Sequence, residues 1–409
     1  MAEEDIISTL PDAILCHILS FLETKHAITT TILSKRWKNL FLSVPVLHFH
    51  TTVTNQNAYL RFNDFVYSVL LSRDPAFPIK TFYLDFTYYD HQILNPHYPM
   101  DTITKWIKFV AQRGLQYLDL CVELDTEGYT ILPITILSCS TLVVLKLIGF
   151  TVEETSFSSV ALPSLKTLHL DNIWFAKLRD FMLFLIGCPL LEDLFTFYVM
   201  FDSEESLTCD EWKNFCLTNL TRADIDCFHY HFPLKAVHNV HSLRLEIDKV
   251  YYRNDSIPTF HNLTQLEFVC SSLHYNWKFL VEVLNHCPKL QKLDLNETYL
   301  GKEPWIRKDE KQNWVDPNFV PQCLTLHLRT CNLFNFVGLQ GDLLLARYIL
   351  KNARVLQTMK IRNVGQDKIK KLLSSSPRAS TTCIVTIYQR SKKTGRRMMT
   401  TCCKFHYGS

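Results

Sequence analysis

The stretch CSTLVVLKL at residues 139–147 has the same spacing of cysteine and leucine as the stretch CPKLQKLDL at residues 287–295. The last six residues of each follow the pattern L-x-x-L-x-L, which also occurs at residues 115–120 and 165–170. Side chains two positions apart share one face of an extended strand, so the last two leucines of each copy lie on a common face. The pattern therefore predicts a short strand with one buried face in each copy.

Looser copies extend this pattern along most of the chain. Weaker ones start at Ile79 and Leu356, and apolar residues at helical spacing separate several copies, as at Ile103, Ile107 and Val110. A strand and a helix in every ~20–29 residues are typical of leucine-rich repeats, which stack because one unit cannot bury its own apolar face. The expected fold class is α/β, a leucine-rich-repeat solenoid with parallel strands and a helical or irregular convex side. Between the weak copies at Ile79 and Leu356, successive copies start 20 to 33 residues apart, at Leu115, Leu142, Leu165, Leu191, Leu220, Val240, Leu263, Leu290 and Cys323.

The composition is that of an ordinary globular protein. Hydrophobic residues make up 47% and charged residues 20% of the 409 residues, which excludes wholesale disorder. The ten glycines form no GxGxxG or GxxxxGK[ST] pattern, which argues against a phosphate-binding loop. Lysine and arginine exceed aspartate and glutamate by only three, 43 against 40, so we expect no nucleic-acid partner.

Targeting signals are weak throughout the sequence. No segment approaches the ~20 apolar residues needed to span a bilayer, and the N-terminus MAEEDIIS is acidic, without a secretory hydrophobic region. We therefore expect no membrane partner and a cytoplasmic or nuclear location, where the 14 cysteines are free thiols. Residues 390–409 carry six basic residues and no acid, and KKTGRR at 392–397 is either a nuclear-import signal or part of a solvated tail.

Cysteine placement follows the repeat. Cys139, Cys188 and Cys287 each stand three residues before the first leucine of a copy, where a small apolar side chain fills a turn. A catalytic or zinc-bound thiol is the alternative, but the adjacent pair Cys402 and Cys403 lacks C-x-x-C spacing, and the 16 histidines form no HExxH. No G-x-S-x-G elbow supports a hydrolase. We expect no metal, no cofactor and no catalytic residue.

The first fifty residues do not follow the repeat. Pro11 suits the first position of a helix whose apolar stripe includes Ile14, Leu15, Ile18, Leu19 and Leu22. A second helix is predicted to be capped by the Thr24 hydroxyl and to end at Leu33, and a third to open at Ser34. Three such short helices cannot bury all these side chains among themselves, so the first helix is a candidate docking surface.

The stretch LPDAILCHILSFLETKHAITTTILSKRWKNL at residues 10–40 resembles an F-box in its plant form. F-boxes bind the Skp-type adaptor of SCF (Skp–cullin–F-box) ubiquitin ligases. The sequence departs from the common pattern at Glu23, His26 and Phe41, none of which is an anchor position. A small helical cap that seals the first repeat is the alternative. The resemblance implies adaptor binding through Leu10, Pro11, Ile14, Leu15, Ile18, Leu33 and Trp37.

A second resemblance lies near the C-terminus. The segments VPQCL at 320–324, GLQG at 338–341 and ARYILKNARVLQTMKI at 346–361, preceded by Trp314, are similar to the FBD domain of plant F-box proteins. Trp305 and Trp314 are either exposed binding aromatics or packed side chains. The chain is expected to comprise an F-box at 1–50, a linker helix and first weak repeat at 51–114, repeats at 115–300, an FBD-like region at 301–389 and a basic tail at 390–409.

These resemblances imply a substrate-recognition subunit of an SCF-type E3 ubiquitin ligase. The F-box would bind the Skp-type adaptor and, through it, the cullin and RING subunits, whose E2 transfers ubiquitin. The chain would contribute proximity to an unknown protein substrate and would not be an enzyme. Two alternatives remain open: an F-box scaffold that degrades nothing, and a small-molecule-sensing receptor, although nine or ten repeats would make only a short arc.

Substrate is expected on the face of the sheet that carries the residues between the buried leucines. Eight acids and five bases occupy these alternate positions, which favours a partner with some positive charge. Phe195 and Phe197 stand out because aromatic residues are enriched at interface hot spots, although they could instead pack beneath residues 200–212. The substrate-binding candidates are Phe195, Phe197, Asp224, Asp226 and Arg244.

Overall fold

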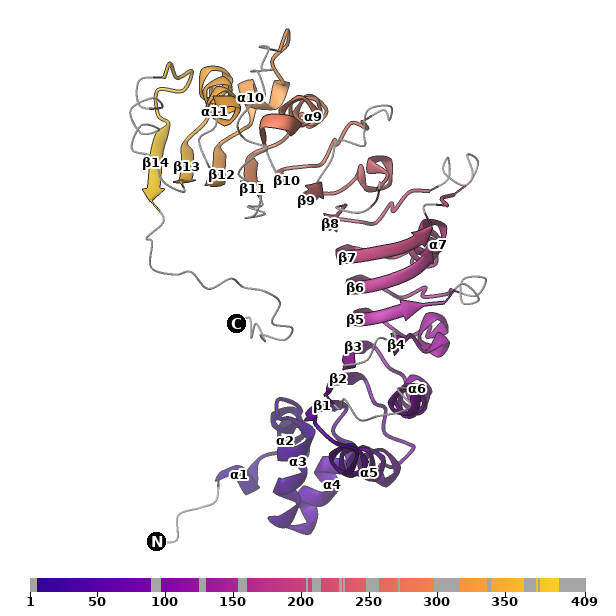
Figure 1. Ribbon diagram of the computed structural model, residues 1–409. Helices are drawn as coiled ribbons and strands as arrows, with labels where there is room; N and C mark the ends of the chain where they lie inside the picture. The colour runs from indigo at the N-terminus through magenta and orange to yellow at the C-terminus, as the bar shows by residue number, and fades with distance from the viewer. Residues whose placement is uncertain are drawn as a thin grey trace. The chain divides into compact units, whose positions relative to one another are not determined.

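The structure is a computed structural model, and its strands and helices fall into two compact units (Figure 1). The first unit comprises Met1–Leu191 and Phe197–Lys213, and the second comprises Glu192–Thr196 and Asn214–Ser409. The residues described are 6–89, 97–124, 130–153, 160–203, 205–207, 215–227, 230, 232–247, 257–270, 273–297, 317–336, 340–363, 373 and 376–389.

The first unit opens with short helices: α1 (Ile6–Thr9), α2 (Asp12–Ser20), α3 (Thr24–Thr29), the 3-10 turn η1 (Thr30–Ile32) and α4 (Lys35–Ser43). Ser34 caps α4 as predicted, because its hydroxyl accepts a hydrogen bond from the Trp37 backbone N–H at 3.5 Å. Helix α3 starts at Thr24 as predicted, but the predicted cap by the Thr24 hydroxyl was wrong. Glu23 precedes α3, and the Thr24 hydroxyl instead accepts the backbone N–H of His48 at 2.8 Å. That bond ties α3 to the first strand.

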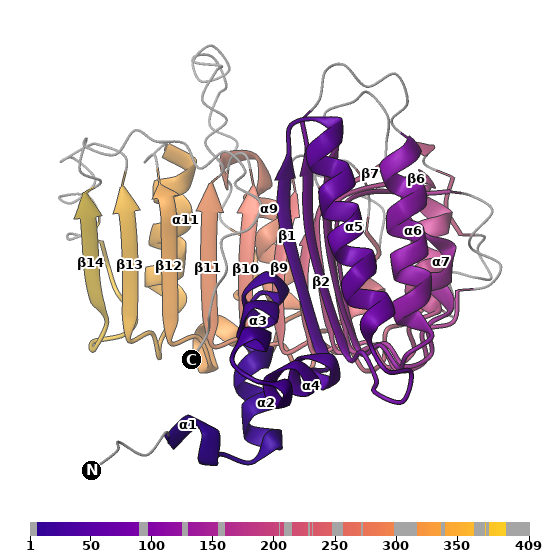
Figure 2. The same cartoon turned by 90° about the horizontal axis from the view of Figure 1, so that it is seen from below.

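The strands of the first unit run parallel in the order β1 (Val46–Val53), β2 (Thr81–Tyr88), β3 (Tyr117–Leu124), β5 (Val144–Val152) and β6 (Thr167–Lys177). The short β4 (Thr130–Ile131) pairs with β5. One face is covered by α5 (Gln56–Ser72), α6 (His97–Ala111), the turn η2 (Ile134–Ser138) and α7 (Leu178–Ile186), and Figure 2 shows α5 and α6 side by side along it. Apolar residues of adjacent strands align, as Phe82, Leu118 and Leu145 do.

The second unit continues the same design. Residues 193–196 of β7 (Asp193–Ser203) pair with β8 (Arg222–Asp226), after which the parallel order is β9 (Ser242–Ile247), β10 (Gln265–Cys270), β11 (Lys292–Glu297), β12 (Thr330–Phe336), β13 (Thr358–Asn363) and β14 (Ile384–Gln389). The helical elements are η4 (Leu234–Val237), α9 (Leu273–Asn285), α10 (Gln322–Leu326) and α11 (Gln340–Asn352). Figure 2 shows α9 and α11 on one face of these strands.

The predicted α/β leucine-rich-repeat fold is confirmed, with strands at the copies that start from Ile79 to Leu290 and at Leu356. The copy placed at Cys323 was wrong. Cys323 and Leu326 belong to α10, and the true copy runs from Leu328 through Cys331 to Leu333 in β12. The strands β1 and β14 were not predicted.

Three residues with positive φ lie in consecutive strands of the first unit: Gly149 (φ 82°) in β5, Asn172 (φ 52°) in β6 and Tyr198 (φ 50°) in β7. Gly149 and Asn172 are each followed by a residue that pairs across the two strands, Phe150 with Ile173. The alternation of buried and exposed residues restarts after each of these residues. In each strand, the residue with positive φ is therefore one extra residue in the alternation. It bends the strand, and the apolar side chains after it stay on the face of the sheet that the helices cover.

Candidate functional site

Helix α2 has one buried and one exposed apolar face. Leu15 and Leu19 are 0% and 1% exposed, whereas Ile14 and Ile18 are 46% and 44% exposed. Side chains four apart stack on one side of a helix, so Ile14 and Ile18 form a continuous apolar ridge. Further large apolar side chains exposed on the F-box helices and their connections are Ile6, Ile7, Phe21, Leu22, Ile32 and Leu33.

The predicted adaptor-binding residues divide between this surface and the interior. Ile14, Ile18 and Leu33 are exposed, as is Pro11, while Leu10 and Trp37 are half-buried. Leu15, which is also predicted to contact the adaptor, is 0% exposed. Leu15 faces the interior, because the stripe on α2 is wide enough to supply both a core face and an exposed face.

A polar clamp fixes the turn before α2. The Arg36 guanidinium donates to the Leu10 carbonyl at 2.6 Å and to the Asp12 carboxylate at 2.6 and 2.9 Å. These contacts bind the start of α4 to the turn at Leu10 and Pro11. The interaction of Arg36 with Asp12 was not predicted from the sequence, because only apolar residues were selected as candidates. Both residues lie within the stretch at 10–40 that resembles an F-box.

Arg73 joins the F-box helices to the repeats. It is 2% exposed, and its guanidinium donates to the Val44 carbonyl and, at 3.5 Å, to the Phe41 carbonyl, at the end of α4. A cation suits the C-terminal end of a helix, where carbonyl groups lack partners. Burial lowers the pKa of Arg73 to about 10. This contact, with the bond between Thr24 and His48, fixes the F-box to the first repeat.

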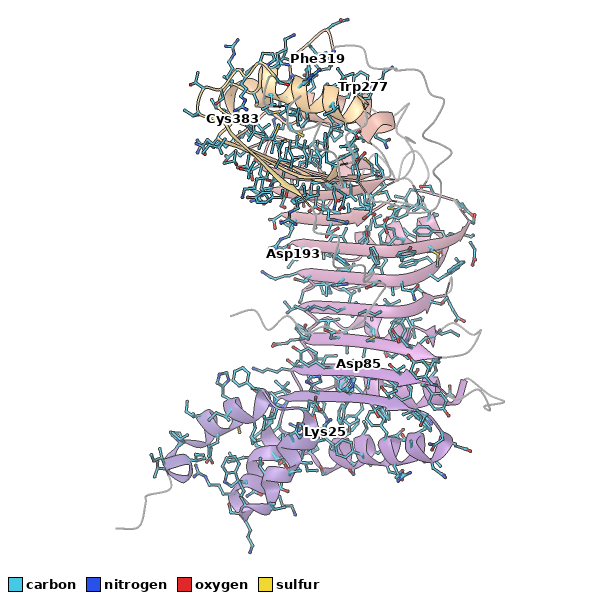
Figure 3. The ribbon with its side chains drawn as sticks, turned by 60° about the vertical axis from the view of Figure 1, so that its left-hand side comes forward. Lys25, Asp85, Asp193, Trp277, Phe319 and Cys383 are labelled. Carbon is cyan, nitrogen blue, oxygen red and sulfur yellow. The ribbon has the colours of Figure 1, made fainter. Side chains whose placement is uncertain are left out.

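A cavity of about 320 Å³ lies at the junction of α3, β1 and α5. Its wall includes Phe49, Phe62 and Phe65, and its polar lining includes Lys25 and His50. Lys25 pairs with Glu23 at 2.8 Å, and His50 lies 2.9 Å from Asp85 on β2, with Lys25 and Asp85 marked in Figure 3. Its volume is at the lower limit for small-molecule pockets.

The face of the sheet opposite the helices, called here the open face, carries aromatic and charged residues in the first unit. The Tyr83 ring lies 5.2 Å from that of His48 and 4.8 Å from that of Tyr117. Lys146 lies 5.5 Å above the Tyr117 ring and 3.9 Å from Asp119. Burial raises the pKa of Tyr117 to about 12, so its hydroxyl is neutral and can donate a hydrogen bond.

In the second unit, the open face centres on Arg244. Its guanidinium lies 2.8 Å from Asp224, 2.6 Å from Glu246 and 3.6 Å from Glu267. On the next strands, Asp294 accepts hydrogen bonds from Lys292 and Asn332, each at 2.7 Å. Ion pairs thus join β8, β9 and β10, and a hydrogen bond joins β11 to β12.

The structure brings three of the five predicted substrate-binding residues together. Phe195, Asp224 and Arg244 are half-buried neighbours in one register across β7, β8 and β9. Asp226 is only 5% exposed, and its contact with substrate stays a prediction. Phe197 is half-buried with its ring 4.8 Å from that of Tyr198, and residues 208–212 of the segment predicted to cover it lie outside the described part.

Other residues of the open face were missed as binding candidates. Tyr83, Tyr117 and Asn332 occupy the same alternate strand positions as the residues selected, so the repeat register could have identified them. Trp305, Trp314 and the basic tail at 390–409 lie outside the described residues.

The repeat cysteines are packed side chains. Cys139, Cys188 and Cys287 are each at most 8% exposed, and the Cys188 thiol donates to the Phe184 carbonyl at 3.3 Å. Burial raises the pKa of Cys188 to about 12, which disfavours the reactive thiolate. In the described part of the chain, no three metal-ligating side chains are grouped to hold a metal ion, and no helix there is long and apolar enough to cross a membrane.

Comparison with known proteins identifies three domains. The family model of the F-box domain matches residues 7–49, that of the LRR repeats of FBD-associated F-box protein At5g56370 matches residues 103–227, and that of FBD matches residues 316–361. F-box/FBD/LRR-repeat protein At4g26340 of Arabidopsis thaliana is 30% identical over 92% of this chain and 98% of its own length. FBD-associated F-box protein At5g56370 of the same plant is 30% identical over 86% of this chain and 89% of its own. F-box/LRR-repeat protein At4g14096 is 40% identical over 46% of this chain and 39% of its own.

Proposed function

Because the chain belongs to the plant family of F-box/FBD/LRR-repeat proteins, we propose that it is the substrate-recognition subunit of an SCF-type ubiquitin ligase. F-box domains generally bind Skp-type adaptors, and proteins of this family are typically adaptor subunits rather than enzymes. In the proposed complex, the cullin-bound RING partner and its E2 transfer ubiquitin. This chain holds the substrate near them and so raises its effective concentration.

The observation that supports this proposal most directly is the apolar ridge of Ile14 and Ile18 on α2. Both side chains are nearly half exposed to solvent although the helix buries Leu15 and Leu19 on its other side. An exposed group of large apolar side chains is characteristic of a protein interaction site. The clamp of Arg36 on Leu10 and Asp12 holds the start of this helix in place for a partner.

Replacing Ile14 and Ile18 together by aspartate is expected to weaken binding of a Skp-type adaptor at least tenfold. Each buried isoleucine contributes about 1.5–3 kcal/mol of transfer free energy, and a buried carboxylate adds a desolvation cost. Binding is measured by calorimetry with purified adaptor. Leu71→Asp is the matched control, since Leu71 is 71% exposed on α5, outside helices α1–α4, and should leave binding unchanged. Full adaptor binding by the folded double variant would contradict the proposal.

The open face is the proposed site for the protein substrate. Half-buried aromatic and charged side chains there are already held by neighbours, so little side-chain entropy is lost on binding. Affinity purification with cullin activity blocked should enrich proteins that are lost when cullin is active. If captured proteins persist unchanged with active cullin, the chain acts instead as a scaffold that degrades nothing.

A further inference from the structure

Five consecutive members of one register position lie on β8–β12 on the open face of the second unit, between Phe195 on β7 and Lys360 on β13. Asp224, Arg244, Glu267, Asp294 and Asn332 follow one another on β8–β12, and we call them the acidic row. Lys292, two residues before Asp294 on the same face of β11, pairs with Asp294 at 2.7 Å. Counting Glu246 and Lys292 beside the row and Lys360 next to Asn332 on β13, four carboxylates face three cations, which leaves a net negative charge on this surface.

Arg244 lies close to several carboxylates. It lies within 4 Å of Asp224, Glu246 and Glu267, which stand on β8, β9 and β10. Burial raises the pKa of each of these three carboxyl groups, and neighbouring carboxylates add to the effect, although Arg244 opposes it. The carboxylates are therefore incompletely compensated by the cations that the described residues provide.

Asn332 supplies an independent sign of a missing partner. It is 8% exposed and donates its side-chain N–H to Asp294 at 2.7 Å, which fixes the amide against the row. Its carbonyl oxygen Oδ1 is buried and accepts no hydrogen bond from any described residue. A buried acceptor without a donor destabilises a protein by about 1–3 kcal/mol. A ligand that brings an N–H donor to this place would remove that cost.

We propose that the acidic row binds an extended peptide segment carrying two lysine or arginine side chains three or four residues apart. The spacing follows from geometry. Neighbouring strands lie about 4.8 Å apart, so Asp224 is about 10 Å from Glu267 and about 14 Å from Asp294 along the row. An extended peptide rises about 3.3 Å per residue, so three or four residues cover these distances. One cation meets Asp224, and the other meets Glu267 and Asp294.

This inference rests on the proposed function, since it specifies the chemistry of the substrate segment. It predicts a donor-rich, positively charged sequence and disfavours an acidic or phosphorylated one. A negatively charged, partly buried surface attracts a basic segment and repels an acidic one, so it contributes both affinity and specificity. The two proposals are nevertheless separable, because the F-box surface and the acidic row involve different residues.

The test uses the full chain and two fluorescent peptides, GSSKSSSKSSG and its counterpart with glutamate in place of both lysines. Anisotropy titration should show binding of the lysine peptide alone, weakened by added salt. Glu267→Lys should raise Kd at least tenfold. Glu282→Lys, the matched control on α9, makes the same charge change on a helix rather than on the row and should keep Kd within twofold.

Asn332→Lys provides a second variant. Its ammonium group would pair with Asp294 within the chain, and the substitution removes the unpartnered Oδ1, so it should abolish peptide binding. Equal binding of both peptides, or an unchanged Kd in Glu267→Lys, would overturn the proposal. Binding seen only after removal of residues 390–409 would also overturn it, because the chain's own basic segment would then be the occupant. Adaptor binding is measured for all variants as well. If a variant binds the adaptor but the peptide result contradicts the proposal, only the proposal for the acidic row fails and the proposed function stands.

Discussion

At the scale of single residues, the N-terminal helices are held both by contacts within a few residues, such as that of Ser34 with Trp37, and by contacts across many residues, such as that of Thr24 with His48. Ser34 could be predicted as a helix cap because capping depends on the residues just after it. Thr24 and Leu15 could not be assigned in this way. The Thr24 hydroxyl bonds a strand residue 24 positions away, and the burial of Leu15 depends on which side of α2 packs inward. Both are decided by tertiary contacts.

Asp171 gives a pH-dependent prediction. It is half-buried on β6, and burial raises its pKa to about 6 from 3.8. Between these two values the folded state binds more protons than the unfolded state, so stability falls as the pH rises from about 4 to about 6. Asp171→Asn should therefore raise the free energy of unfolding at pH 7.5 by about 1–2 kcal/mol, with allowance for partial exposure.

The measurement is thermal or urea unfolding of both proteins at pH 7.5 and at pH 4.5. The gain from Asp171→Asn should shrink at the lower pH, where the native aspartate is already protonated. Asp64→Asn, on an exposed position of α5, is the control and should have little effect at either pH. A gain from Asp171→Asn that is equal at both pH values would show that the carboxyl charge is not its cause.

At the scale of elements, the repeat pattern predicted strands well because period-two burial is written directly into L-x-x-L-x-L. It failed at Cys323, because residues three apart also share one face of a helix, which is what α10 forms there. The bends at Gly149, Asn172 and Tyr198 could not be predicted. Gly149, which lacks a side chain, and Asn172 are residue types that tolerate positive φ, but Tyr198 is not, and the pairing across strands becomes visible only in the folded sheet.

Gly149→Ala should destabilise the protein by at least about 1 kcal/mol more than Gly114→Ala. Both glycines have positive φ, 82° and 76°, so both substitutions carry the same conformational strain. A Cβ at Gly149 would lie 2.7 Å from the Val122 carbonyl oxygen, whereas one at Gly114 would be 3.9 Å from its nearest neighbour. Urea unfolding measures the difference. Equal losses in the two variants would mean that β3 and β5 adjust without cost.

At the scale of the whole molecule, each unit is a run of parallel strands in which a repeat is stabilised by its neighbours. The last described strand, β14, pairs with β13 on one side, and its Ile384 and Tyr388 side chains are 66% and 48% exposed. By contrast, Cys331 and Leu333 of β12 are fully enclosed between β11 and β13. Protection of the backbone amides against exchange should therefore decrease from β12 to β14 in the second unit.

Hydrogen exchange followed by mass spectrometry should show this gradient. Amide protons of β14 are expected to exchange at least tenfold faster than those of β12, because the end strand can open without disturbing a neighbour beyond it. Strand β13 should be intermediate. Uniform protection of all three strands would indicate that the second unit opens only as a whole.

The buried Arg73 also determines how pieces of this chain could be exchanged with a relative. A graft that stopped at residue 50 would carry α4 but leave behind the guanidinium that satisfies the Phe41 and Val44 carbonyls, and it would cut through β1. A chimera joined after Tyr88 would keep that cation, the bond from His48 to Thr24 and the pairing of β1 with β2. The portion that can be inherited as one piece is therefore larger than the F-box, and recombination within it would separate groups that stabilise each other.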